Sequence, residues 1–286
     1  MDEAEKRRRA IPAGLVANGC TRHCLEDVRR GVNWAAEKSP RHLADALQRG
    51  MRGAFREVDE EIAYYLVTET NAPLGSADPW NLSFMTSLRL WEALIERGWD
   101  INQRSTQQPS SQRFRLIDFV CDRENLFEWL LDHGATLDDG EKDDWKCPPL
   151  LQSVAERGFV SQYKRLQELG APHGPRELHL AVETSCYREH MNMLRFLVDE
   201  IGWDVNQLDE DTNMSHGPPL WWAIQNSKGG EKAVRFLLER GADPSVNGMD
   251  LFKDAEERGN QGVLEVLQEW KDGKIPVQKK DSSSDQ

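Results

Sequence analysis

Hydrophobic residues recur along the chain in two kinds of short amphipathic stretch. The longer kind places an apolar pair about one turn before a glycine, as in LWEALIERG from Leu90, LFEWLLDHG from Leu126 and VRFLLERG from Val234. The shorter kind lies upstream and repeats apolar residues at positions i, i+1, i+4 and i+5, as in PPLWWAIQNS from Pro218. Such spacing gathers the apolar side chains on one face of an α-helix. The pattern therefore predicts a series of short helix pairs.

Glycines mark the expected ends of the longer helices. They are Gly98, Gly134, Gly170, Gly202 and Gly241, at successive intervals of 36, 36, 32 and 39 residues. Glycine suits this position because it readily adopts the left-handed conformation that ends many helices. Gly31 and Asn71 are expected to extend the series toward the N-terminus. A period in the middle thirties predicts a solenoid, in which stacked helix pairs bury a core that no single pair could form.

Two of these stretches carry a family resemblance. LHLAVE from Leu178 and FLLERGADP from Phe236 resemble the two helices of the ankyrin repeat, and residues 248–270 resemble a terminal ankyrin repeat. The resemblance covers residues 11–270 in about eight units, with the best match over 175–270 and an irregular region up to about residue 98. It implies an all-α, ankyrin-type helical-repeat solenoid with short hairpin or loop fingers. We expect a flexible basic N-terminus over residues 1–10 and a disordered C-terminal tail over residues 271–286.

The repeats also depart from the family pattern. The threonine that opens the first helix of the family repeat is replaced by Pro148, Arg176 and Pro218. Trp99 and Trp203 replace the small residue that follows the glycine. An indole at this position must pack beneath the next turn or project onto a surface. His179 occupies the position at which the family has a structural histidine, so we interpret it as structural.

Composition and charge narrow the function classes. The chain of 286 residues has 49 acidic residues against 36 lysines and arginines, for a net charge of −13, which disfavours nucleic-acid binding. No apolar run approaches the roughly 18 residues of a membrane helix, and no apolar stretch follows the basic N-terminal cluster as in a secretory signal. Five cysteines, an odd number, suggest reduced thiols. We expect a cytoplasmic protein, with the nucleus as an alternative because residues 6–9 are basic.

The sequence lacks most of the motifs that are typical of catalytic and metal-binding sites. The sequence has no phosphate-binding loop, no dinucleotide fingerprint and no zinc-protease or hydrolase motif. CTRHC from Cys20 lacks the second ligand pair of a zinc site, so we favour packing of both thiols on one helix face. Cys186 and His190 lack the third group that would orient a nucleophile pair. The acidic stretches from Asp138 and Leu208 fit solvated loops better than cation sites. We predict no metal and no cofactor, and the sequence favours a non-enzymatic protein without identifying catalytic residues.

The family resemblance implies that the fingers and first helices line a concave groove. Carried over unit by unit, the groove residues are Trp145, Cys147, Glu156, His173, Glu183, Thr184, Met214, Ser215, Trp222, Gln225 and Asn226. Ala155 and Gly217 fall at equivalent positions. Trp221 and Trp222 are adjacent on one helix and point about 100° apart, so at most one can lie fully in the core.

Two function classes follow. The leading hypothesis is an intracellular protein–protein interaction module that binds a basic or neutral protein partner in the groove, with no nucleic acid and no membrane. The alternative is an enzyme or small-molecule binder with a Trp-lined pocket, in which Glu156, Glu183 or His173 would act as acid or base. That alternative requires the fingers after Asp138 and Gln207 to fold over the groove.

Overall fold

The computed structural model describes residues 13–106, 113–138, 148–188, 190–208, 217–225 and 230–278. Within these ranges the regular secondary structure is helical, apart from one antiparallel bridge between Arg104 and Arg115. The prediction of an all-α repeat fold is therefore confirmed. The described residues form two compact units, one up to residue 138 and the other from residue 148. None of their helices is both long enough and apolar enough to span a lipid bilayer.

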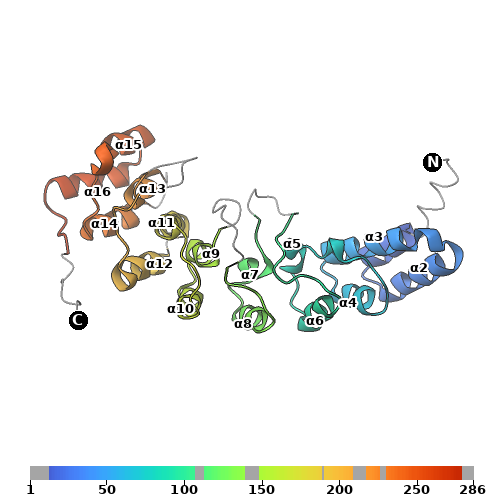
Figure 1. Cartoon of the computed structure of the whole chain (residues 1–286). Coiled ribbons are helices and arrows are strands. Elements are labelled where there is room, and N and C mark those ends of the chain that lie inside the picture. The colour runs from blue at the N-terminus through green and yellow to red at the C-terminus, as the bar shows by residue number, and fades with distance from the viewer. Residues whose placement is uncertain are drawn as a thin grey trace. The chain divides into compact units, whose positions relative to one another are not determined.

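The first unit consists of stacked helices of unequal length. In chain order they are a helix over residues 13–21, α2 (Leu25–Lys38), η1 (Pro40–His42), α3 (Leu43–Arg56), α4 (Glu60–Thr68), η2 (Leu74–Ser76), α5 (Pro79–Leu82), α6 (Leu88–Glu96), α7 (Leu116–Phe119) and α8 (Glu124–Asp132). Helix α3 packs against α2 and α4, α4 packs against α6, and α5 packs against α7. Figure 1 shows α3, α5 and α7 in one row and α4, α6 and α8 in a second row.

The second unit repeats the arrangement more regularly. It contains α9 (Leu150–Arg157), α10 (Val160–Glu168), α11 (Glu177–Arg188), α12 (Asn192–Arg195), η3 (Phe196–Ile201), α13 (Pro219–Gln225), α14 (Glu231–Glu239), η4 (Val246–Gly248), α15 (Leu251–Arg258) and α16 (Gln261–Lys271). Helices α9, α11, α13 and α15 pack in sequence as the first-helix row, and α14 packs on α16 in the second-helix row (Figure 1).

Glycine ends the longer helices as expected, with exceptions near the N-terminus. Gly98, Gly134, Gly170, Gly202 and Gly241 all have positive φ, between 77° and 94°. Gly31 is different because it lies inside α2. A Cβ atom there would lie 3.1 Å from the backbone nitrogen of Val16, so this glycine permits close packing of α2 on the preceding helix. Asn71 does not adopt the left-handed conformation. The expectation that these two residues end helices in the same way is wrong.

One second helix contains an inserted residue. Six positions separate Phe196 from Gly202, whereas five separate Phe236 from Gly241. The extra residue is accommodated by a π-helical segment, η3, which continues from α12. A π-helical turn closes its hydrogen bond over five residues instead of four, so it takes in one extra residue without breaking the helix. This segment ends at Gly202, as the sequence predicts.

A side-chain bridge joins successive repeats at the sequence Gly-Trp-Asp-x-Asn, which occurs at 98–102 and at 202–206. In the first copy, Asn102 Nδ2 donates to the carbonyl of Gly134 at 3.0 Å and Oδ1 accepts from the backbone nitrogen of Thr136 at 2.8 Å. In the second copy, Asn206 makes the corresponding bonds to Gly241 and Asp243, at 3.1 and 2.8 Å. We call this contact the asparagine bridge.

The two tryptophans of this sequence have different surroundings. Trp99 is buried, and its Nε1 donates to the carbonyl of Ala77 at 2.7 Å. Trp203 is only half-buried. The equivalent residue in the following repeat is Ala242, which is fully packed.

Part of the C-terminal tail is packed on the last repeats. The segment expected to be disordered begins at Lys271, which is the last residue of α16. Ile275 is buried, and the backbone nitrogen of Gln278 donates to the carbonyl of Glu239 at 2.7 Å. Residues 274–278 therefore form a strap that reaches back to α14. Residues 1–10 and 279–286, which were expected to be flexible, lie outside the described residues.

Candidate partner-binding surface

Three of the predicted groove residues line one hollow at the ends of two first helices. Glu156 and Arg157 end α9, while Glu183, Thr184 and Tyr187 belong to the second half of α11. They surround a hollow of about 410 Å³. We call it the α9–α11 hollow. Helix α11 packs directly on α9, so the regular stacking of first helices is what brings these residues together.

The hollow combines acidic groups with an exposed aromatic ring. The side chain of Thr184 donates a hydrogen bond to the backbone carbonyl of Glu156, which joins the two helices at the rim. Burial raises the pKa of the Glu183 carboxyl, and the nearby positive charge of Arg176 partly offsets that rise. Tyr187 is 71% exposed. Sequence reasoning missed Tyr187, although an aromatic residue late in a first helix was the available signal.

Trp222 lies in the next repeat and packs against α11. Its ring makes an edge-to-face contact with buried His179, with centroids 6.1 Å apart, and the guanidinium of Arg176 lies 5.0 Å from the ring centroid. Trp221 contacts Trp222 edge to face and covers Gly217, where a Cβ atom would lie 2.6 Å from the Trp221 ring. Both tryptophans are half-buried, so neither lies fully in the core. Ala155 and Gly217 are buried and present no groove surface.

His173 is part of a separate cluster at the N-terminal end of α11. Its Nδ1 lies 3.3 Å from Oε1 of Glu177, a carboxylate that is fully buried. Glu177 also accepts hydrogen bonds from the Tyr163 hydroxyl and from the backbone nitrogen of Gly174. Burial raises the pKa of Glu177, while these donors partly offset the rise. The structure therefore places His173 in this cluster and not among the residues that line the α9–α11 hollow. The sequence analysis missed Glu177.

The remaining predicted groove residues divide into two groups. Gln225 ends α13, and its side-chain oxygen accepts a hydrogen bond from Arg258 of α15. The others lie outside the described residues; they are Trp145, Cys147, Met214, Ser215 and Asn226.

The structure places the residues of each cysteine motif in different surroundings. Cys20 is buried in the helix over residues 13–21, but Cys24 follows a turn at His23 and precedes α2. The expectation that both thiols share one helix face is wrong because His23, with φ of 52°, reverses the chain between them. Cys186 is buried in α11, whereas His190 is exposed beyond its end. Among the described residues, no cluster of three or more histidine, cysteine or acidic side chains has the geometry to hold a metal ion.

Comparison with known protein families identifies one repeat in the second unit. The family model for the ankyrin repeat matches residues 218–248, which span α13, α14 and η4. The crystal structure of the human ASB11 ankyrin repeat domain aligns with a TM-score of 0.47 and 20% identity, over 70% of this chain and 84% of that one. The ankyrin repeat domain of Bcl-3, described as a unique member of the IkappaB family, aligns with a TM-score of 0.41 and 16% identity, over 76% and 84%. A search of curated protein sequences found no match.

The matched repeat has the same construction as its neighbours. Its first helix, α13, packs between α11 and α15, and its second helix ends at Gly241 in the left-handed conformation. The asparagine bridge from Asn206 ties its turn to the preceding repeat. Residues 218–248 therefore carry an ankyrin repeat, and the helix pairs on either side of it share its construction.

Proposed function

We propose that this chain is an intracellular protein-interaction module that binds a basic or neutral protein partner at the α9–α11 hollow. The observation that carries the proposal is the exposed ring of Tyr187 beside Glu156, Glu183 and Thr184. An aromatic anchor surrounded by polar groups that exclude water is typical of an interaction hot spot. Ankyrin-repeat homology supports protein binding in general.

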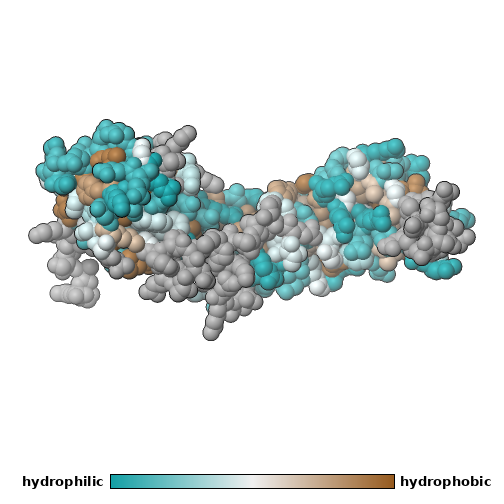
Figure 2. Space-filling model, turned by 90° about the horizontal axis from the view of Figure 1, so that it is seen from above, coloured by the Kyte–Doolittle hydropathy of each residue, from teal (hydrophilic) through white to brown (hydrophobic). Residues whose placement is uncertain are grey.

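Charge supports the choice of partner. The charged residues that line the hollow are two acids, Glu156 and Glu183, and one arginine, Arg157, and the chain has a net charge of −13. A negative surface speeds encounter with positively charged partners and repels acidic ones. Seen from the first-helix side, hydrophilic residues cover much of the C-terminal repeats, with smaller apolar areas between them (Figure 2). Such a mixed surface suits a non-obligate interface.

The extent of the interface follows from the packing of the first helices. A standard protein interface buries about 800 Å² on each partner, which is more than one hollow of this size offers. We propose that the contact continues along the first-helix row to half-buried Trp222 on α13, which packs on α11. The thiols of Cys20, Cys24 and Cys186 form no disulfide bond, which supports an intracellular location.

Site-specific crosslinking tests this proposal. Tyr187 is replaced by the photoreactive p-benzoylphenylalanine in the full chain, which preserves an aromatic ring at an exposed position. The control carries the same residue at Leu169, which is 40% exposed at the end of α10 in the other helix row. We expect one or a few defined protein adducts from Tyr187 in extracts of the native cell, and none of the same adducts from Leu169.

A double substitution that should weaken partner binding gives the second measurement. Tyr187→Ala combined with Glu183→Gln should weaken capture of the crosslinked partner by about 30-fold, the effect of losing a hot-spot residue. Melting temperatures of variant and wild type must agree for this comparison. Identical adducts from both crosslinker positions would contradict the proposal. If no protein adduct forms and small molecules from the extract stabilise wild type but not the variant, the small-molecule alternative replaces it.

A further inference from the structure

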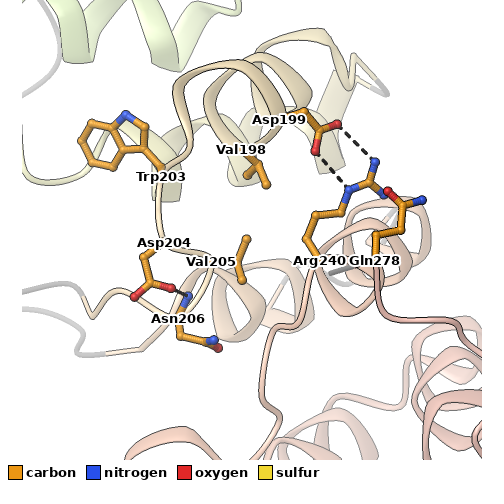
Figure 3. Close-up of a pocket in the computed structure, with 8 residues that line it drawn as sticks. All are labelled: Val198, Asp199, Trp203, Asp204, Val205, Asn206, Arg240 and Gln278. Atoms are coloured by element: carbon orange, nitrogen blue, oxygen red, sulfur yellow. Dashed lines mark hydrogen bonds and ion pairs between the residues drawn. The ribbon is translucent and has the colours of Figure 1, made fainter. Parts of the chain in front are cut away.

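A second hollow, of about 450 Å³, lies among the second helices and the strap of the C-terminal unit. Val198 and Val205 point toward one another across its centre, with Arg240 on one side (Figure 3). Trp203 lies on the other side with its ring directed away from the valines, in edge-to-face contact with His173 at 5.8 Å between centroids. Gln278 of the strap lies beside Arg240 at the rim. This Trp203 hollow is formed by elements of the second-helix row, so it is a different surface from the α9–α11 hollow.

Two local departures from the repeat pattern create the Trp203 hollow. The inserted residue turns the end of the second helix into the π-helical η3, which contributes Val198 and Asp199 to the wall. π-Helical turns are rare and occur frequently at functional sites. The second departure is Trp203 itself, since the next repeat has the small, buried Ala242 at this position. Trp99 occupies the same position in the first unit, but it is buried and hydrogen-bonded to Ala77.

The walls of the hollow select for a particular chemistry. The half-buried indole of Trp203 offers an apolar surface beside the floor that buried Val198 and Val205 form. Asp199 and Asp204 place exposed carboxylates at the rim. The single cation of the lining, Arg240, is paired with Asp199 through contacts of 3.1 and 3.2 Å. It also pairs with Glu239 at 2.9 Å and lies over the ring of Phe236. Because Arg240 is neutralised in this way, the charge presented by the rim is negative.

We propose that the Trp203 hollow binds a lysine or arginine side chain presented by a basic segment of a partner protein. The aliphatic stem of such a side chain packs on the accessible part of the Trp203 indole, and its charged end lies beside the Asp204 carboxylate. Long cationic side chains combine an apolar stem with a charged head, and a cation is attracted to the face of an indole. This inference is independent of the proposed function, because it concerns another surface.

The chain offers a matched control for this site. Asp204 Oδ1 accepts a hydrogen bond from the backbone nitrogen of Asn206 at 2.9 Å, and Asp100 Oδ1 accepts the same bond from Asn102 at 2.9 Å. Asn substituted at either position retains an oxygen for this bond. Asp204→Asn and Asp100→Asn therefore remove the same charge from the same local geometry. Only the first change touches a hollow with a half-exposed indole.

The experiment titrates the full chain, labelled with 5-fluorotryptophan, with a peptide of alternating glycine and lysine. A peptide with glutamine in place of lysine is the control. The ¹⁹F resonance of Trp203, assigned with Trp203→Phe, reports contact at the site, and fluorescence anisotropy of the labelled peptide gives its affinity. We expect the lysine peptide alone to shift this resonance. Asp204→Asn should weaken binding about threefold to fivefold, the effect of one exposed ion pair, and Asp100→Asn should leave it unchanged.

Two further outcomes decide the proposal. Trp203→Ala, which restores the small residue of the next repeat, should weaken binding about tenfold because it removes the indole face. Equal effects of Asp204→Asn and Asp100→Asn, or an unchanged Trp203 resonance, would overturn the proposal. Lys279 and Lys280 follow Gln278 in the sequence and supply the same chemistry from within the chain. Tighter peptide binding by the Lys279→Gln, Lys280→Gln variant would support the site by showing that these lysines compete for it.

Discussion

The side chain of Asn206 bonds the backbone of Asp243 in the next repeat, with Oδ1 accepting from the amide nitrogen at 2.8 Å. Its Nδ2 donates to the carbonyl of Gly241 at 3.1 Å. One planar amide thus satisfies a donor and an acceptor of a turn whose backbone groups have no helical partners. Asn102 forms the same bridge in the first unit, so the contact occurs once in each unit among the described residues.

Replacing Asn206 with alanine should destabilise the second unit. Two hydrogen bonds are lost while the turn groups keep some access to water, so we expect a loss of about 1–2 kcal/mol in the free energy of unfolding. Urea unfolding followed by circular dichroism measures it. Asn206→Asp provides the control, because a carboxylate still accepts from Asp243 but cannot donate to Gly241. An alanine variant as stable as wild type would show that the bridge contributes nothing.

Close packing at the N-terminal helices predicts opposite effects for two glycines. A Cβ atom at Gly19 would lie 2.8 Å from the backbone nitrogen of Val28, whereas one at Gly14 meets no atom within 4 Å. Gly19→Ala should therefore lower the free energy of unfolding by about 1–3 kcal/mol, since α2 must move. Gly14→Ala should raise it by up to about 1 kcal/mol through helix propensity. Thermal melts of both variants test this, and equal effects would be inconsistent with the packing.

Buried thiols should resist alkylation. Burial raises the pKa of Cys20 and of Cys186 from 9.0 to about 11, so each has about a hundredfold less thiolate at pH 8 than an unperturbed thiol. We expect iodoacetamide to modify Cys24, which is half-buried, long before these two residues. Peptide mass spectrometry after timed labelling gives the order, and labelling in urea is the control. Rapid modification of Cys186 in the folded protein would revive a reactive Cys–His pair.

The buried Glu177 predicts a pH dependence of stability. Its pKa is raised above 4.5 by burial, so the folded state holds the proton more tightly than the unfolded chain. The free energy of unfolding should consequently fall as pH rises from about 4.5 through the raised pKa. Glu177→Gln keeps an acceptor for Tyr163 and should remove this decline. The decline in the free energy of unfolding amounts to about 1.4 kcal/mol for each unit by which the pKa is raised. Unfolding of both proteins across this range tests it, with exposed Glu256→Gln as control. A constant difference between Glu177→Gln and wild type would contradict it.

Much of the fold could be predicted because its determinants are local. The amphipathic spacing of the first helices and the glycines at 98, 134, 170, 202 and 241 depend on residues within one or two turns. Gly31 shows where local reasoning ends. A glycine that permits a left-handed turn and one that permits close helix packing are identical in sequence, and only the position of Val16 distinguishes them. The extra residue between Phe196 and Gly202 was not recognised from the sequence, and the sequence does not indicate whether a loop or a π-helical turn accommodates it.

The candidate site was less predictable than the fold. Glu156, Glu183 and Thr184 meet because α11 stacks on α9, which the family resemblance implies. His173 was placed by the same reasoning, yet its partner is the buried carboxylate of Glu177, four positions along the chain. A buried acid in an amphipathic helix has no distinctive sequence signal, because nearly all acids in such helices lie at the surface. Tyr187 became a candidate only once its exposure was known.

The asparagine bridge also has an evolutionary consequence. Each bridge joins the segment just after one helix-ending glycine to the turn at the next helix-ending glycine. In the second bridge, the variable segment of the chain begins after the asparagine, at Gln207. The glycines joined in this way are 36 residues apart in one case and 39 in the other, with the same bonds formed. Mutation can therefore lengthen or shorten the segment after the asparagine without changing the joint. Loop length and repeat stacking can therefore diverge separately, so that the surface near these loops can change while the joint between repeats is kept.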